Sequence, residues 1–110
     1  MPNTVTDIKG AAFWGCEKLT NIELFSKLEK ISSAAFGSCK SLQSITIPAS
    51  VNNIDVEIYN GIVFGVVFDD CTNLKEVNIK KGSPLLVNGE VPQELATKLG
   101  VDKSKIKIVD

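Results

Sequence analysis

The sequence of 110 residues contains no histidine, only one tryptophan and one tyrosine, and an odd number of cysteines, three. It also lacks an HExxH motif and a glycine-rich phosphate loop. Nucleophilic and metal-assisted catalysis need a base or a ligand set of these kinds. We therefore expect a protein that is not an enzyme, with no catalytic and no cofactor-binding residues. Three thiols without a CxxC pair or histidine are too few for zinc, so no metal site is expected.

Charge and hydrophobicity exclude two further classes of partner. The 12 basic residues and 13 acidic residues nearly balance, and the basic ones are scattered along the chain. We therefore expect no nucleic-acid partner. No apolar run approaches the roughly 18 residues of a membrane span, and the stretch begins with no signal-peptide pattern. With 44% hydrophobic residues, the sequence predicts one folded domain with a modest core.

A repeat of about 23 residues organises the sequence. Three units, 2–24, 25–47 and 48–79, place an aromatic residue, a cysteine and two aliphatic residues at equal spacing: Phe13, Cys16, Leu19 and Ile22; Phe36, Cys39, Leu42 and Ile45; Phe68, Cys71, Leu74 and Val77. The third unit is longer by nine residues, which lie between Ile54 and Phe68. Such a period predicts a solenoid, in which each coil buries its apolar side chains against its neighbours.

Alternating apolar residues in each unit predict a short β-strand. The strands, within 19–24, 42–47 and 74–79, are expected to stack as a parallel sheet with the apolar side chains facing the core. The residues between them then face outward, and they are candidate partner-binding residues: Asn21, Glu23, Ser44, Thr46, Glu76 and Asn78. Any solvated sheet has a polar outer face, so this second interpretation stays open.

Other positions in the unit favour structural roles. The apolar pair Val5 and Ile8, three residues apart, predicts an irregular extended arm, and 10–13 and 33–36 predict single helical turns. The repeated phenylalanines are expected in the core. The cysteines are expected to form a column of buried thiols, because equivalent side chains of stacked coils point the same way. Asp69 and Asp70 fit a charged turn better than a cation site.

The sequence after Ile79 breaks the repeat. The stretch from Lys80 to Pro84 interrupts the pattern, and no fourth unit follows it. Residues 92–99 predict a short helix that ends at Gly100, and 105–108 predict a last strand. We therefore divide the chain into a solenoid, 1–81, and a C-terminal cap, 82–110; an independent functional module is the alternative for the tail. The chain also begins in the middle of the repeat pattern, from which we expect a piece of a longer array.

An apolar insertion, about 55–67, interrupts the third unit. Asn60-Gly61 is the preferred dipeptide of a two-residue hairpin turn, and β-forming residues flank it. The insertion either projects from the coil or packs along it. If it projects, the candidate residues for contacting a partner or a second copy of the chain are Ile58, Tyr59, Val63 and Phe64.

The repeat resembles the BspA-like leucine-rich repeat family, whose units run roughly IPxSVTxIGxxAFxxCxxLxxI. The matching stretches are AAFWGCEKLTNIEL in 11–24, AAFGSCKSLQSITI in 34–47, ITIPASVNNI in 45–54 and FDDCTNLKEVNI in 68–79. The resemblance implies an α/β-type leucine-rich repeat solenoid with short parallel strands and brief helical turns. It also implies a non-catalytic protein-interaction or adhesion module at the cell surface or outside the cell, with a host or cell-surface protein as partner. A purely structural spacer, or the C-terminal end of a longer array, is the alternative.

Overall fold

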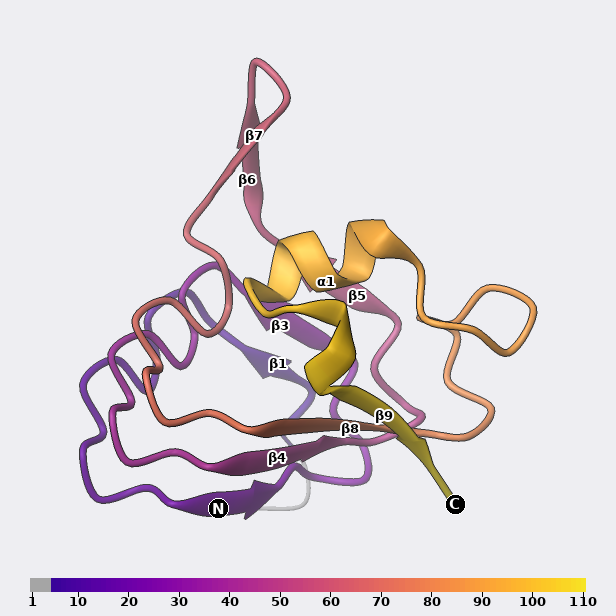
Figure 1. Cartoon of the computed structure of the whole chain (residues 1–110), viewed down its shortest axis with the longest axis horizontal. Coiled ribbons are helices and arrows are strands. Elements are labelled where there is room, and N and C mark those ends of the chain that lie inside the picture. The colour runs from indigo at the N-terminus through magenta and orange to yellow at the C-terminus, as the bar shows by residue number, and fades with distance from the viewer. Residues whose placement is uncertain (1–4) are drawn as a thin grey trace.

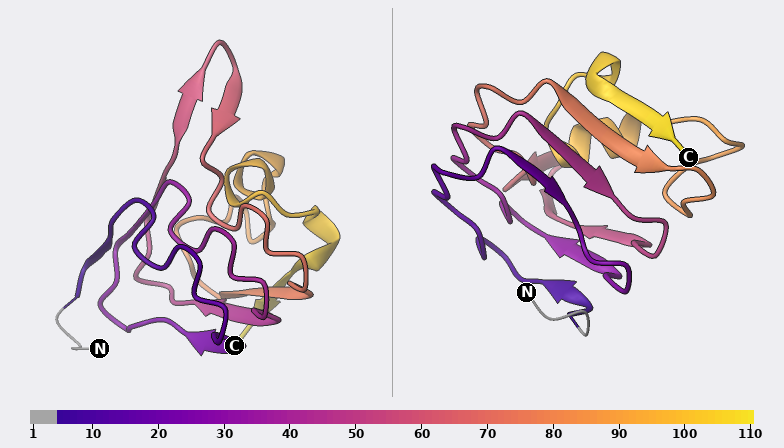
Figure 2. Two further views of the ribbon diagram at one scale, coloured as in Figure 1. Left: turned by 90° about the vertical axis from the view of Figure 1, so that its left-hand side faces the viewer. Right: turned by 90° about the horizontal axis from the view of Figure 1, so that it is seen from below.

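A computed structural model describes residues 5–110, which form a β-solenoid of about four parallel turns with little helix (Figure 1). One side of each coil contributes a strand to a three-stranded sheet: β1 (Asp7–Ile8), β3 (Lys30–Ser32) and β5 (Asn53–Asp55). The other side contributes to a four-stranded sheet: β2 (Asn21–Glu23), β4 (Ser44–Ile47), β8 (Glu76–Lys80) and β9 (Ile106–Val109). Figure 2 shows the coils stacked one behind another.

The strand register equals the sequence repeat. Ile8 pairs with Ile31, and Ile31 with Ile54, while in the larger sheet Ile22 pairs with Ile45 and Ile45 with Val77. The expectation of irregular arms at the first apolar pair of each unit was wrong, because β1, β3 and β5 are paired strands. Stacking at a constant period brings equivalent backbone groups opposite one another, and buried backbone groups must find a partner. Even a segment of two or three residues therefore forms a parallel ladder.

The expected single helical turns are also wrong. In segment 11–15, N–H groups alternate between two destinations: Ala11 donates to Ser33 O of the next coil at 3.0 Å, Ala12 to Lys9 O of its own coil at 3.1 Å, and Phe13 to Ala35 O at 2.8 Å. Ala11 has a positive φ of 56°. A helix would keep all of these bonds within one coil. The alternation instead lets each turn close locally and still join its neighbour.

The core is a set of stacked columns. The rings of Phe13 and Phe36 stack at 5.1 Å with an interplanar angle of 5°, and those of Phe36 and Phe68 at 5.8 Å and 27°. This confirms the phenylalanines as core residues. Around them lie fully buried aliphatic side chains from both sheets and from the segments that precede the strands, among them Leu28, Ile31, Leu42, Ile45, Ile47, Val77 and Ile79.

The tail covers the C-terminal side of the third coil. Helix α1 (Gln93–Leu99) begins after Pro92, ends at left-handed Gly100 and buries Leu95, Ala96 and Leu99. Val67 and Phe68 donate their N–H groups to the carbonyls of Lys98 and Leu99 at 3.2 and 3.0 Å. After the 3₁₀ turn η1 (Lys103–Lys105), strand β9 pairs in parallel with β8. The tail thus stands where a further coil would.

The described part of the chain, 5–110, contains no helix that is long and apolar enough to cross a membrane.

Candidate functional site

The six outward-facing residues predicted on the larger sheet do lie together. Asn21, Ser44 and Glu76 share one row across β2, β4 and β8, and the next row contains Glu23, Thr46 and Asn78. Asn21 and Glu23 are exposed, whereas the other four are partly buried. The prediction that these six residues share one face of the sheet is confirmed.

Most of this face is occupied by its own contacts. Ser44 Oγ donates to Asn21 Oδ1 at 2.7 Å, and Asn78 Nδ2 donates to Thr46 Oγ1 at 3.5 Å. Lys107 Nζ of β9 binds Glu76 Oε1 at 2.7 Å. Lys107 was missed, because the 105–108 alternation predicts a strand without saying which sheet it joins. Five of these six residues therefore already have a polar partner within the protein.

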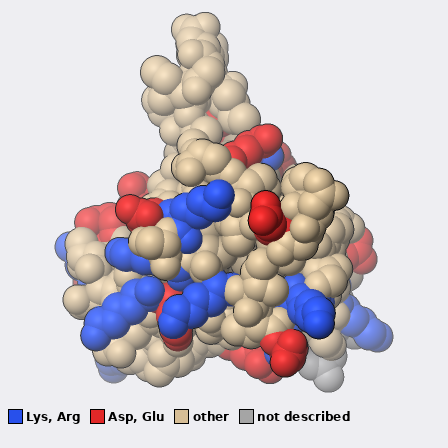
Figure 3. Space-filling view, turned by 45° about the vertical axis from the view of Figure 1, so that its right-hand side comes forward, with Lys and Arg blue, Asp and Glu red and all other residues tan. Residues whose placement is uncertain are grey.

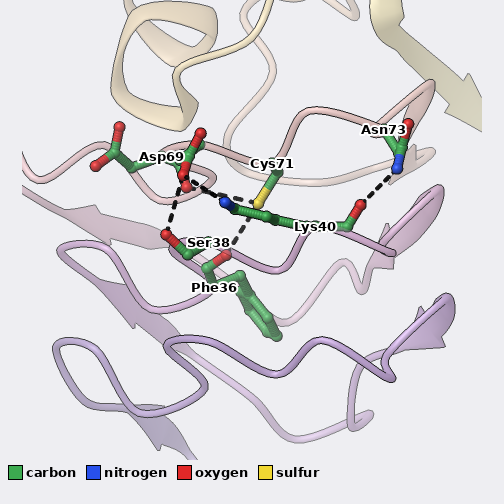
Figure 4. A network of polar contacts seen from close by, with 7 residues as sticks. Phe36, Ser38, Lys40, Asp69, Cys71 and Asn73 are labelled. Atoms are coloured by element: carbon green, nitrogen blue, oxygen red, sulfur yellow. Dashed lines mark hydrogen bonds and ion pairs between the residues drawn. The ribbon is translucent and has the colours of Figure 1, made fainter.

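The three cysteines form a column that runs between the coils, and all are free thiols. Cys39 Sγ donates to Phe13 O of the preceding coil at 3.2 Å, and Cys71 Sγ donates to Phe36 O at 2.9 Å (Figure 4). Only Cys39 is fully buried; Cys16 and Cys71 are partly exposed. The expectation of three buried thiols was therefore wrong at two positions. Of the three, Cys39 alone has a coil of the repeat on both sides.

The thiol environment disfavours a reactive cysteine. Burial raises the pKa of Cys39, and burial together with the nearby carboxylates of Asp69 and Asp70 raises the pKa of Cys71 to about 11. Because the thiolate is the nucleophile, a raised pKa keeps these two thiols protonated and slow at neutral pH.

The adjacent carboxylates Asp69 and Asp70 lie in a turn, and Asp69 is next to Cys71 of this column (Figure 4). Asp70 Oδ2 accepts a hydrogen bond from Ser38 Oγ at 3.3 Å and lies 3.8 Å from Lys40 Nζ. Asn73 Nδ2 donates to Lys40 O at 2.7 Å in the same region. Within residues 5–110, no three His, Cys, Asp or Glu residues lie together as a metal site would require. The pair links neighbouring coils.

The insertion forms a hairpin that projects from the third coil (Figures 1 and 2). Strands β6 (Glu57–Tyr59) and β7 (Ile62–Phe64) are antiparallel, with Tyr59 opposite Ile62. Asn60 and Gly61 both have positive φ, 52° and 78°, as the expected two-residue turn requires. Of the two alternatives, projection from the coil and packing along it, the structure shows projection.

The hairpin exposes large apolar side chains. Exposed fractions are 56% for Ile58, 70% for Tyr59, 59% for Ile62 and 50% for Phe64, while Val63 is partly buried. In Figure 3 the projection carries neither basic nor acidic colour over most of its length. Ile62 was missed among the candidates, although the two-residue turn places it opposite Tyr59.

The register divides these residues between two faces. Tyr59, Ile62 and Phe64 share one face with Glu57, whereas Ile58 and Val63 share the other. The projecting segment is also narrower than 55–67. Asp55 belongs to β5, paired with Ser32, and Val67 is fully buried in the core. The insertion proper is therefore 56–64, and removing it would restore the 23-residue period.

A shallow, mostly apolar hollow lies on the outer side of the first coil. Its lining includes Phe13, Cys16 and Leu19. The equivalent side of the second coil is covered by the first, with Phe13 stacked on Phe36. The hollow is therefore a coil-stacking face.

One comparison with known proteins identifies a family. The family model described as the BspA type leucine-rich repeat region, with six copies, matches residues 1–84. Neither the curated proteins nor the solved structures include a match to this chain.

Proposed function

This chain belongs to the BspA-type leucine-rich repeat family, and we propose that it is a protein-interaction or adhesion module whose main contact surface is the β6–β7 hairpin. Modules of this family are typically protein-binding, are generally non-catalytic and commonly come from surface proteins. We propose a cell-surface or extracellular location, a host or cell-surface protein as partner, and no catalytic activity for this chain.

The observation that carries the proposal is the exposure of four large apolar side chains on one projecting element. Ile58, Tyr59, Ile62 and Phe64 are each at least half exposed. Solvated apolar surface is unfavourable by roughly 25 cal/mol per Å², and a projecting apolar patch on a folded domain tends to mark an interaction site. Tyrosine and phenylalanine also supply large, rigid contact area of the kind found at interface centres.

The polar sheet face supports the proposal less strongly. Its hydroxyl and amide groups bond to one another, as in the Ser44–Asn21 pair, and its Glu76 is paired with Lys107. A partner would have to replace those bonds, and exchanging one hydrogen bond for another yields little net affinity. We therefore rank the hairpin above Asn21, Glu23, Ser44, Thr46, Glu76 and Asn78.

Two variants of the whole chain test this ranking against purified matrix and cell-surface proteins immobilised on a biosensor. The hairpin variant combines Tyr59→Ser and Phe64→Ser; the sheet-face variant combines Asn21→Ala, Thr46→Ala and Asn78→Ala. We expect the hairpin variant to lose binding at least about tenfold and the sheet-face variant to change it less than about threefold. If only the sheet-face variant loses binding, the hairpin is not the main contact surface. If the unaltered chain binds none of these proteins, the result favours the spacer role.

A further inference from the structure

We propose that β7 is a docking edge for a second copy of this chain, and that the two copies pair antiparallel about Val63. This inference rests on the proposed function, in which the hairpin is a contact surface, and it names the partner for one edge of that hairpin.

The backbone of Val63 has groups that point away from the hairpin. In a two-residue hairpin the residues next to the turn, Tyr59 and Ile62, exchange both backbone hydrogen bonds. Ile58 and Val63 form the next pair, and their N–H and C=O groups therefore point outward on opposite edges. Neither makes a backbone hydrogen bond to the rest of the described chain. Each edge thus offers one donor and one acceptor.

These edges carry none of the usual protection against pairing. Natural edge strands are blunted by lysine, proline or a bulge. Strand β9, the C-terminal edge of the larger sheet, follows that rule: it contains the exposed residue Lys107, and the exposed Lys105 directly precedes it. By contrast, residues 58–64 contain no charged residue and no proline. Both edges of the hairpin therefore lack the protection that β9 has.

The absence of charge also favours a second copy. Like-charged groups would repel when a surface meets itself; β7 has none, and the one charged residue of the hairpin, Glu57, lies on β6, away from the pairing edge. A two-fold axis through Val63 places Val63 opposite the second copy's Val63, where the two exchange both hydrogen bonds. It also places Ile62 opposite the second copy's Phe64, on the face that already holds Tyr59. An aliphatic–aromatic cross-strand pair of this kind is stabilising.

The β6 edge is less suitable for the same arrangement. Pairing about Ile58 would place Glu57 opposite the second copy's Tyr59, with the two Glu57 carboxylates on one small face. The hairpin extends beyond the body of the solenoid (Figures 1 and 2). A strand can therefore approach β7 along its length. Pairing through the three residues of β7 buries less surface than the roughly 800 Å² per partner of a standard interface. We therefore expect a weak dimer.

Matched proline substitutions on the two edges test the proposal by sedimentation velocity over a concentration series. Val63→Pro removes the outward N–H of β7 and leaves the hairpin's own bonds intact; Ile58→Pro does the same on β6. We expect a monomer–dimer equilibrium with a dissociation constant on the order of 100 μM for the unaltered chain. Val63→Pro should raise this constant at least about tenfold, and Ile58→Pro less than about threefold.

Hydrogen exchange of the unaltered chain provides a second measurement that does not depend on how well a variant folds. The Val63 amide should become more protected as concentration rises, while the Ile58 amide should not. The proposal is overturned if the unaltered chain stays monomeric at 1 mM. It is also overturned if Ile58→Pro weakens dimerisation more than Val63→Pro does, or if only the Ile58 amide becomes more protected. All of these experiments use the pure chain, so their failure leaves the biosensor test of a foreign protein partner unaffected.

Discussion

At the residue scale, equal repeat positions do not have equal chemistry. Cys16, Cys39 and Cys71 occupy one position of the unit, but only Cys39 is fully buried. Cys39 and Cys71 donate to the phenylalanine carbonyl of the preceding coil, whereas Cys16 lines the hollow of the first coil. Neighbouring coils, rather than the residue type, set the accessibility of each thiol.

This difference predicts an order of reaction with a thiol reagent at pH 8 in native buffer. Cys16 should react first, because it lines an open hollow. Cys71 should follow slowly, since its pKa near 11 leaves only a small thiolate fraction, and Cys39 should need denaturant. The rate at Cys71 should still be rising between pH 9 and pH 11. Mass analysis of labelled peptides measures the order, and labelling of Cys39 as fast as Cys16 would contradict it.

A second residue-scale feature is the contact between Trp14 and Gly37. These residues occupy one repeat position in adjacent coils, and a Cβ atom on Gly37 would lie only 2.1 Å from the ring carbons Cε3 and Cζ3 of Trp14. The indole is half exposed. Gly37 is therefore required for space, because the ring of one coil lies on the backbone of the next.

Gly37→Ala should move the Trp14 ring into solvent and shift the emission of this single tryptophan to longer wavelength. We expect a stability loss of about 1 kcal/mol, since the ring is already half exposed. Gly10→Ala is the matched control, because its nearest atom, Ser33 O, lies 3.4 Å from the added Cβ. An unchanged spectrum for Gly37→Ala would show that the two residues do not touch.

At the element scale, the hairpin is separable from the coil that carries it. Asp55 pairs with Ser32 in the three-stranded sheet, and Gly65 O accepts the N–H of Ala34 just as Ser33 O accepts that of Ala11. Both ends of the insertion are therefore already at regular repeat positions. The nine residues between them, 56–64, project from a coil that is complete without them.

Deleting residues 56–64 should therefore give a folded protein. Its far-UV circular dichroism spectrum should differ from that of the full chain only by the contribution of the hairpin. Its free energy of unfolding should fall by no more than about 1–2 kcal/mol, which corresponds to the partly buried side chain of Val56. Deleting 55–67 instead removes the buried Val67 and should lose several kcal/mol. Equal stabilities of the two deletions, measured by urea unfolding, would disprove this boundary.

At the scale of the whole molecule, the tail provides what a fourth coil would. It contributes a strand to the larger sheet, two carbonyls to the N–H groups of the third coil, and the buried side chains of Leu95, Ala96 and Leu99. Gly100 allows the close approach, because a Cβ there would lie 2.4 Å from Val66 Cγ2. Without this cover, the apolar side of the third coil would face water.

We therefore expect a truncation after Lys81 to aggregate. Leu99→Ala is a graded form of the same test: the side chain is fully buried, so its removal should cost about 2–4 kcal/mol in urea unfolding. Leu86→Ala, at a partly buried position of the same tail, should cost less than half as much. A truncated protein that stays monomeric and as stable as the full chain would show that the tail is not a cap.

The sequence by itself determined the features that depend on periodicity and local backbone preference. A 23-residue repeat predicts stacked coils, the alternation from Ile22 to Leu24 predicts which side chains face the core, and Asn60-Gly61 predicts a two-residue turn. The family resemblance is carried by the same repeat. These features depend on residues that are close in the sequence or on a pattern that recurs, so they can be predicted from the sequence alone.

Only the tertiary structure decided the features that depend on which coil lies beside which. Stacking turned the supposed arms into paired strands, replaced the expected helical turns by N–H groups shared between coils, and left Cys16 and Cys71 partly exposed. It also brought Lys107 to Glu76 and turned the hairpin away from the body. The physical reason is that burial and hydrogen-bond partners are set by contacts between residues more than 20 positions apart, which a local pattern does not specify.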